Sequence, residues 1–443
     1  MDANLLTYGG ARRTPLWLVM LVGLAAGIIA GLVFAPNGLV VLPADTLKAM
    51  TEWVMLPARL FLALITMVVI PLVFCSILLS VTESGGMEFL RRTGTGVIIY
   101  FTVCTFIAVA IGVMISHVVN PAQYAPANWM VAGDGTLPDT AETAAKLTDG
   151  KSIPQLIVGV IPVNPVSALM EQQMLSIVIG AFLAGLALLS LPRKQAQPVI
   201  DVCTGVLAAC MKVVYWALWL APFAVFGFLF GLVVEAGDEA LTGLIGYMLA
   251  VILGLLTIMV GYLLIVWLGA RRNPFEFLKQ SRDVIMLAFS SSSSSATMPL
   301  TLSTAENALK VRPEIARLVI PMGTIINMDG TAVYQIIVAL FLTSLMGIDL
   351  TMMQTVILCT TIVFAAIGTP GTPGVGLVVL GVILSDLGIP PEAVGVILSV
   401  DRLLDMCRTV INVMGDLTAA VLFDRLTPQG TLPFPTNAEE SPV

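Results

Sequence analysis

Charged residues are scarce in this chain of 443 residues, where lysine, arginine, aspartate and glutamate together make up 11%. A soluble globular protein carries roughly 25% charged residues, because its surface must face water. Hydrophobic residues make up 58% of the sequence, and the mean hydropathy is +0.98. The shortage of charge therefore excludes an ordinary soluble protein and indicates a surface that faces lipid.

Other residue types are missing in ways that exclude particular sites. Histidine occurs once, as His117, so a metal centre with several histidine ligands is excluded. The six cysteines are scattered without a CxxC pair, and we interpret them as buried thiols instead of a disulfide framework or zinc site. The net charge of −7 argues against nucleic acid as a partner, because binding it calls for clustered lysine and arginine.

Long apolar runs are what the sequence has in abundance. An apolar stretch of about 20 residues spans a bilayer as a helix. We expect spanning helices at residues 15–34, 54–80, 96–119, 172–191, 204–233, 241–268, 314–346 and 394–423. The first run is long for a signal-peptide core and has no small-x-small cleavage pattern, so we interpret it as a spanning helix.

Basic pairs at the ends of these runs give an orientation. The pairs are Arg12 with Arg13, Arg91 with Arg92, Arg193 with Lys194, and Arg271 with Arg272. Counting spans puts all four on one side, which the positive-inside rule makes the cytoplasm, and the intervening loops are acidic or neutral. The sequence thus predicts a multi-pass protein of the cytoplasmic membrane with both termini in the cytoplasm.

Two apolar segments are interrupted at their centres. Residues 284–309 contain six consecutive serines, Ser290 to Ser295, and residues 353–385 contain GTPGTPGVG, from Gly368 to Gly376. Irregular backbone at membrane depth is tolerated only where it is buried in protein or lines an aqueous cavity. Basic residues flank the first segment and acidic residues the second, so we expect two re-entrant hairpins of opposite orientation. Such pairs indicate the binding site of a transporter built from inverted repeats.

The last apolar run carries an unusual set of polar residues. Spacings of four, three, one, three and four put them on one helical face: Asp401, Asp405, Arg408, Thr409, Asn412 and Asp416. Charges at bilayer depth survive by pairing, by facing a cavity or by binding ions. Three carboxylates against one guanidinium leave negative charge that bound cations would compensate.

A second polar cluster, NMDGT from Asn327 to Thr331, interrupts the preceding apolar run. We expect Gly330 to weaken the helix there. Asn327 and Asp329 offer oxygen ligands to a hard cation, and unwound backbone would add carbonyls. The two clusters together predict a cation site.

With these motifs the chain resembles the sodium:dicarboxylate symporter family, which includes glutamate and aspartate transporters. The resemblance covers nearly the whole chain and is strongest in SSSSATMPL (Ser292 to Leu300), NMDGT, GTPGTPGVG and DxxxDxxRTxxNxxGD (Asp401 to Asp416). It implies an all-α polytopic membrane protein with eight transmembrane helices and two opposed re-entrant hairpins. It also implies a homotrimer in which each subunit moves a transport unit against a static scaffold.

The resemblance divides the chain into three parts. Residues 1–120 would hold scaffold helices 1 and 2 and helix 3 of the transport unit, and residues 121–235 an extracellular loop with scaffold helices 4 and 5. Residues 236–443 would form the transport core. This core would contain helix 6, a hairpin at about 275–310, helix 7 at about 314–346, a hairpin at about 353–385, helix 8 at about 394–423 and a cytoplasmic tail.

Substrate contacts carry over from the family motifs. Arg408 would fork the side-chain carboxylate of an acidic amino acid, aspartate or glutamate, while Asp405 accepts the amino group with help from Thr409. The other implied contacts are Asn412 and Thr331, Ser294 in the first hairpin, and backbone near Thr372 and Gly376 in the second.

The resemblance also implies co-transported sodium at up to three sites. The first would use carbonyls of Gly323, Asn327 and Asn412 with the Asp416 carboxylate. The second would use carbonyls of Ile325, Met328, Ala366, Ile367 and Thr369. The third would use the Phe101 carbonyl, Thr105, Asn327 and Asp329.

Four positions depart from the family pattern. A second arginine is usual near the site, but its two possible positions here hold Ser292 and Met406. Arg402 should point about 100° away from Asp401, so its proximity in sequence is not enough to assign it the missing arginine's place. Cys104 stands where a hydroxyl ligand is usual, and a thiol is a poor sodium ligand, which leaves the ion count open. Pro370 stiffens the second hairpin.

Several alternatives remain at this stage. A C4-dicarboxylate carrier of the same family or a proton-coupled variant is closest, although Asp405 and Thr409 favour a substrate with an amine. A neutral amino acid carrier would have no use for Arg408. A membrane-embedded hydrolase would need a general base near its serine, and no histidine or lysine lies near in sequence, so we do not expect an enzyme. An ion channel would lack saturable, substrate-dependent uptake.

Overall fold

The computed structural model describes residues 7–8, 14–35, 38–40, 42–82, 95–125, 161, 164–170, 174–236, 239–348, 350–367, 369, 371, 374–386, 389 and 391–427. Several positions singled out in the sequence lie outside these ranges. They are Arg12, Arg13, Arg91, Arg92, Pro370, Thr372, most of the predicted loop after residue 125 and the tail after residue 427.

The described chain is nearly all-helical, as predicted, with one two-stranded addition: β1 (Thr7–Tyr8) pairs antiparallel with β2 (Thr14–Pro15). The longer helices are α1 (Leu16–Phe34), α2 (Ala44–Thr82), α4 (Thr95–Val119), α8 (Met174–Ser190), α9 (Arg193–Ala236), α10 (Glu239–Leu264), α14 (Pro313–Ile326), α15 (Asp329–Leu345), α16 (Met352–Ile367) and α18 (Pro391–Leu426). The shorter ones are η3 (Pro121–Tyr124), α7 (Pro165–Met170), η4 (Ile265–Gly269), α11 (Pro274–Gln280), α12 (Arg282–Ser291), α13 (Ser294–Ser303), η5 (Thr304–Ala308) and α17 (Val375–Asp386).

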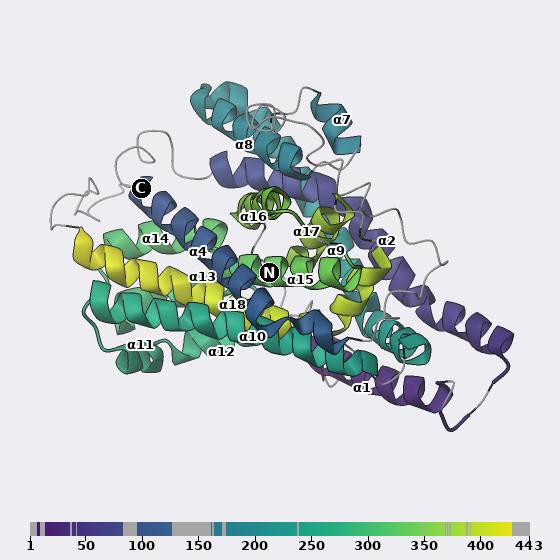
Figure 1. Ribbon diagram of the computed structural model, residues 1–443. Helices are drawn as coiled ribbons and strands as arrows, with labels where there is room; N and C mark the ends of the chain where they lie inside the picture. Colours follow the sequence, from purple (N-terminus) through teal and green to yellow (C-terminus); the bar gives the residue numbers. More distant parts are fainter. Residues whose placement is uncertain are drawn as a thin grey trace.

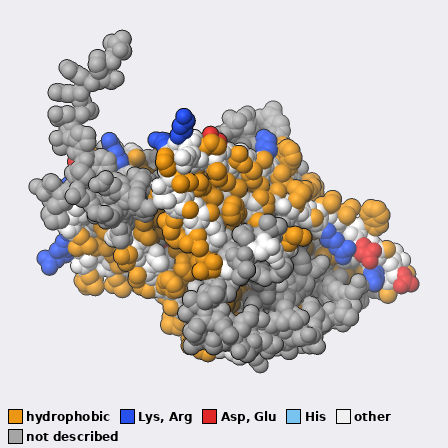
Figure 2. Space-filling model, turned by 90° about the horizontal axis from the view of Figure 1, so that it is seen from above, with side chains coloured by type: hydrophobic (Ala, Val, Ile, Leu, Met, Phe, Trp, Pro, Cys, Tyr) orange, Lys and Arg blue, Asp and Glu red, His pale blue; other side chains and the backbone are white. Residues whose placement is uncertain are grey.

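Six helical stretches within the described ranges are long and apolar enough to cross a membrane. They are Ala44–Val68, Gly96–Tyr124, Arg193–Ala217, Leu241–Gly269, Pro313–Leu345 and Val400–Leu426. Figure 2 shows hydrophobic side chains over much of the described surface on one face and charged side chains toward its margins. The prediction of a polytopic membrane protein agrees with this arrangement.

Two helices extend well beyond the apolar runs that predicted them. Helix α2 begins at Ala44 instead of residue 54, and α9 begins at Arg193 instead of residue 204. Their first turns are polar, so hydropathy alone does not detect them. At about 1.5 Å per residue, the 44 residues of α9 would measure roughly 66 Å if straight, although Pro198 and Pro222 lie within it.

Helices α1, α2, α8 and α9 pack on one another as a first group, with α9 contacting both α1 and α2. Glycines recur every fourth residue on the face of α1 that meets α9. An added Cβ would lie 2.6 Å from the Pro222 carbonyl oxygen at Gly23, and 2.7 Å from the Phe226 carbonyl oxygen at Gly27. Small residues at this spacing let two membrane helices approach backbone to backbone.

Helices α4, α10, α14, α15 and α18 pack together as a second group, which also includes α12, α13, α16 and α17. In Figure 1 the yellow ribbon of α18 runs beside α10 and across the centre of this group. Helices α15 and α18 are largely buried, so their side chains face protein instead of lipid. The polar motifs of the sequence all lie in this second group.

Three helix breaks occur in the second group, at the predicted interruptions. Helix α12 gives way to α13 at Ser292 and Ser293, where Ser292 adopts a left-handed conformation with φ 51°. The Ser293 hydroxyl caps α13 by accepting the Ala296 N–H at 3.2 Å. Helix α16 ends at Ile367, and α17 begins at Val375.

The third break corrects one prediction. We expected Gly330 to weaken the helix, but α14 ends at Ile326 and α15 begins at Asp329, so Gly330 lies inside α15. The glycine serves close packing instead. An added Cβ at Gly330 would lie 2.6 Å from the Arg408 carbonyl oxygen of α18.

Candidate functional site

The broken helices of the second group meet α18 near its middle, since α12, α13, α14, α15 and α17 all contact this helix. The polar residues predicted to share one face of α18 are buried, as are Asn327, Asp329 and Thr331 from the neighbouring break. The structure therefore brings the two polar clusters of the sequence together in one buried region.

Arg408 lies at the centre of this region, and its side chain is 1% exposed. One guanidinium nitrogen, Nη2, lies 2.8 Å from Oδ1 of Asp405 and 3.2 Å from Oδ1 of Asp401. The guanidinium carbon stands 3.9 Å from the ring centre of Tyr334, a cation–π contact. Nε and Nη1 have no hydrogen-bond partner among the described residues. Two buried donors thus remain available to an anion.

Asp405 contacts both charged and backbone donors. Its Oδ2 accepts the Gly374 N–H at 3.2 Å and lies 3.8 Å from Nη1 of Arg402. The second contact is compatible with the expectation that Arg402 points away from Asp401. That expectation was measured from Asp401, whereas Arg402 and Asp405 are three residues apart and lie side by side on the helix. The Thr409 hydroxyl bonds the Asp405 carbonyl oxygen at 2.9 Å.

Asn412 links α18 to the start of α15. Its Oδ1 accepts the Gly330 N–H at 2.8 Å, and its Nδ2 donates to the Thr331 hydroxyl at 3.4 Å. The same Nδ2 lies 3.3 Å from the sulfur of Met328. Asn412 and Thr331, predicted to contact one substrate, are therefore adjacent.

The two hairpin tips also meet. The Ser293 hydroxyl donates to the Gly371 carbonyl at 2.8 Å, and the Ser295 N–H reaches the same oxygen at 3.3 Å. Ser294 is buried beside them. Gly376, from the second tip, lies so close to Arg408 that an added Cβ would be 3.4 Å from Nη1. Thr372, the remaining predicted substrate contact, lies outside the described residues.

Asp329 is held by two hydroxyl groups. Its Oδ1 accepts from Thr105 at 2.8 Å, and its Oδ2 accepts from Tyr262 at 2.6 Å. The same Thr105 hydroxyl oxygen also lies 2.9 Å from the Phe101 carbonyl oxygen. Three members of the predicted third cation site therefore lie together, and a carboxylate, a carbonyl and a hydroxyl are oxygen ligands that suit sodium.

Asn327 joins the predicted first cation site. Its Nδ2 donates to the Asn412 carbonyl at 2.8 Å and to Oδ1 of Asp416 at 2.9 Å. Gly323 faces the same carboxylate, since an added Cβ there would clash with Oδ1 of Asp416. The amide oxygen of the same side chain, Oδ1 of Asn327, is buried without a hydrogen-bond partner among the described residues. An orphaned acceptor beside a buried carboxylate fits a cation.

The predicted second cation site is less assembled. The Ala366 carbonyl accepts the Thr369 N–H at 3.0 Å, a bond that closes the end of α16. Ile325 lies in the last turn of α14, and Ile367 is the last residue of α16. Met328 contacts Asn412 through its sulfur. Among the described residues, the hydrogen bonds at Met328 and Ala366 do not join these five residues into one cluster.

Sequence reasoning missed two side chains of this region, Tyr262 and Tyr334, and it did not foresee the contact of Arg402 with Asp405. The tyrosines lie in apolar helices, where an aromatic residue usually packs against lipid or core. Spacing gave one usable signal, because Tyr334 follows Thr331 by three residues and so shares its face of α15.

A buried polar core where broken helices meet, inside a helical membrane protein, is the arrangement of a secondary transporter. The chain belongs to the sodium:dicarboxylate symporter family, whose sequence model matches residues 16–426. This is a family of transporters, which agrees with the prediction that the protein is not an enzyme.

Individual relatives differ in what their names say they carry. The chain is 31% identical to the proton/glutamate-aspartate symporter of Escherichia coli strain K12, over 82% of this chain and 83% of that protein. It is 31% identical to the proton/sodium-glutamate symport protein of Bacillus subtilis strain 168, over 91% of both. It is also 30% identical to the neutral amino acid transporter B(0) of Oryctolagus cuniculus, over 95% of this chain and 83% of that protein. Similar identities therefore cover acidic and neutral substrates.

Proposed function

We propose that this protein takes up acidic amino acids, L-aspartate or L-glutamate, together with sodium across the cytoplasmic membrane. The observation that carries the proposal is Arg408, buried beside Asp405 with two donors that have no hydrogen-bond partner among the described residues. A substrate with a side-chain carboxylate and an ammonium group would satisfy both residues at once. The names of the bacterial relatives support this substrate class.

Each contact of the substrate follows from the geometry around Arg408. The side-chain carboxylate would take Nε and Nη1, an edge suited to a bidentate contact. The ammonium group would replace Arg408 at one oxygen of Asp405, near Thr409. Asn412 and Thr331 would bind the other carboxylate. Ser294, with backbone near Thr372 and Gly376, would close over the ligand.

Sodium would be cargo in the same region. Asp416 with Asn327, Asn412 and Gly323 would hold one ion, and Asp329 with Thr105, Asn327 and the Phe101 carbonyl another. Ile325, Met328, Ala366, Ile367 and Thr369 would form a further site only after a rearrangement of the second hairpin. Both bacterial relatives described above carry "proton" in their names, so a proton-coupled variant is the alternative for the driving ion.

The proposal also includes the membrane architecture that the sequence predicts. We infer eight transmembrane helices, two opposed re-entrant hairpins formed by α12–α13 and α16–α17, cytoplasmic termini and a homotrimer. The transport unit would comprise helix 3 of residues 1–120 and the core in residues 236–443, moving in an elevator-type step against the scaffold helices of residues 1–235. The helices of each group pack more extensively on one another than on the other group, which supports this division.

Competition binding to the purified protein tests the substrate class. Wild type should prefer aspartate to succinate and to serine, and Asp405→Ala should weaken every substrate with an amine while sparing succinate. Preference for succinate with no effect of Asp405→Ala would replace the amino acid by a C4-dicarboxylate.

Sodium titration of the same binding tests the driving ion, because each ligand must strengthen the other if they are coupled. Aspartate affinity should rise steeply with sodium at fixed ionic strength. A flat response to sodium together with a response to pH would favour the proton-coupled variant.

A further inference from the structure

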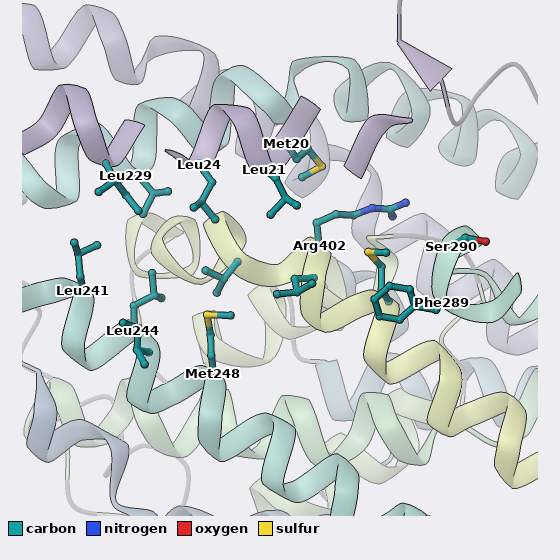
Figure 3. Close-up of a pocket in the computed structure, with 15 residues that line it drawn as sticks. Met20, Leu21, Leu24, Leu229, Leu241, Leu244, Met248, Phe289, Ser290 and Arg402 are labelled. Carbon is teal, nitrogen blue, oxygen red and sulfur yellow. The ribbon is translucent and has the colours of Figure 1, made fainter. Parts of the chain in front are cut away.

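A cavity of about 480 Å³ lies between the two helix groups, beside the polar site. Helices α1 and α9 of the first group form one wall, and α10, α12 and α18 of the second form the other (Figure 3). Leucine, isoleucine, valine, methionine and phenylalanine supply nearly all of the lining. This volume falls within the range of about 300–1,000 Å³ that is usual for small-molecule sites.

One charged residue, Arg402, lines this otherwise apolar space. In Figure 3 its side chain runs past Met20 toward Ser290, while Leu241 and Leu244 line the opposite end. Arg402 is 9% exposed, and its Nε has no hydrogen-bond partner within the described structure. The cavity thus has an apolar length and a cationic end with an unused donor.

We propose that this cavity binds a single-chain amphiphile with an anionic head, a long-chain carboxylate, whose head contacts Arg402. The planar guanidinium suits a carboxylate, and the apolar walls suit an alkyl chain. A phospholipid fits less well, because it carries two chains and a head group anchored at the membrane surface. Exposed lining residues such as Ile245 and Phe289 give the chain an entrance from the lipid side.

The occupant would act on the polar site through Arg402, a step that rests on the proposed function. Arg402 lies 3.8 Å from Asp405, the carboxylate proposed to accept the substrate amino group. A head group that draws Arg402 away leaves Asp405 freer to bind that amino group. The same occupant touches both helix groups and so opposes their relative movement. Aspartate binding should therefore tighten while transport slows.

Direct binding tests the site without any amino acid or sodium present. Full-length protein in nanodiscs of phosphatidylcholine is titrated at pH 8 with radiolabelled dodecanoate, and binding to empty nanodiscs is subtracted. Dodecanoate should saturate at one site per chain. Dodecanol, which lacks the charge, should compete at least about tenfold more weakly.

Two substitutions probe the two ends of the cavity. Arg402→Gln should weaken dodecanoate at least about tenfold and make it no better than dodecanol, whereas Arg402→Lys should keep part of the preference. Met248→Trp should fill the apolar part and remove saturable binding. Met286→Trp is the matched control, because Met286 is exposed on α12 outside the cavity, and it should bind dodecanoate as wild type does.

The outcomes separate the occupant from its effect. Equal binding of dodecanoate and dodecanol, or unchanged binding in Arg402→Gln and Met248→Trp, would overturn the site. Displacement of dodecanoate by phosphatidylglycerol in the nanodisc at low mole fraction would assign the cavity to a phospholipid and overturn the proposed occupant. If the site holds, saturating dodecanoate should raise aspartate affinity at least about fivefold and slow uptake in wild type, but not in Met248→Trp. Dodecanoate binding to a protein that does not bind aspartate would refute the proposed function and leave the site intact.

Discussion

The two helix groups of this protein are held together in different ways. In the first group, the most apolar 18-residue parts of Ala44–Val68 and Arg193–Ala217 are only 25% and 17% buried, and glycines bring the backbones of α1 and α9 together. In the second, the most apolar 18-residue parts of Pro313–Leu345 and Val400–Leu426 are 83% and 78% buried, and charged and amide side chains link the two stretches. Apolar helices that face lipid need only side chains of fitting shape where they meet. A buried polar core also needs a hydrogen-bond or charge partner for each polar group. The second group should therefore respond to changes in polarity, and the first to changes in volume.

The largest effect should come from removing the Arg408 guanidinium at the centre of the second group. Arg408→Ala leaves Asp401 and Asp405 buried without their partner, and such a truncation costs on the order of 2–5 kcal/mol. Aspartate affinity should fall at least about 30-fold, since about 1.4 kcal/mol is tenfold. Competition binding measures the loss, with serine expected to be affected far less than aspartate.

The matched control is Arg282→Ala. Arg282 pairs with Asp283 at the surface with 73% of its side chain exposed, and surface ion pairs contribute little. Aspartate affinity should not change. An equal loss in both variants would mean that net charge, and not the buried core, controls binding.

A change in volume should affect the first group without reaching the site. Gly27→Val places atoms against the Phe226 carbonyl of α9, and overpacking of this kind costs about 1–3 kcal/mol. The thermal unfolding midpoint should fall, while aspartate affinity stays within about twofold because distant sites act independently. Gly205→Val in α9 is the control, since an added Cβ there meets no atom within 4 Å. A large loss of aspartate affinity in Gly27→Val would break the distinction between the groups.

A smaller polar change tests the outer contacts of the cation region. Tyr262→Phe removes the hydroxyl that donates to Asp329 at 2.6 Å. Groups that orient a ligand typically contribute about tenfold or more to ion affinity, so half-saturating sodium should rise about tenfold. Sodium-dependent aspartate binding measures the shift. Tyr124→Phe, at an exposed tyrosine, should leave it unchanged. An unaltered sodium response in Tyr262→Phe would remove Asp329 from the cation sites.

The smallest effect is expected at Cys104, which precedes Thr105 on α4. Cys104→Thr supplies a hydroxyl in place of a thiol and should raise sodium affinity about threefold, or increase the measured coupling ratio. The control is Cys359→Thr on α16, also partly exposed. If Cys104→Thr and Cys359→Thr behave alike in both measurements, Cys104 does not ligate sodium.

The contrast between the groups also explains what the sequence could predict. Apolar runs predicted the helices. The serine run and the NMDGT motif predicted two of the breaks, because polar residues stand out within an apolar run. The beginnings of α2 and α9 were missed because their first turns are polar and do not belong to an apolar run. Spacings of three and four residues predicted the buried face of α18. The partners of that face come from other helices. Tyr262 reaches Asp329 across 67 residues of sequence, a distance that no local pattern reports.

The buried carboxylates outnumber the buried guanidinium groups among the residues described for this region. Arg402 and Arg408 balance Asp401 and Asp405, whereas Asp329 and Asp416 bond only to neutral hydroxyl and amide groups among the contacts described for them. With both ionised, a mobile core without cargo would carry two negative charges through the membrane field. Moving one charge across 100 mV is worth about 2.3 kcal/mol. A potential that is negative inside would push such a core outward, so the voltage itself would hasten the return of the unloaded carrier.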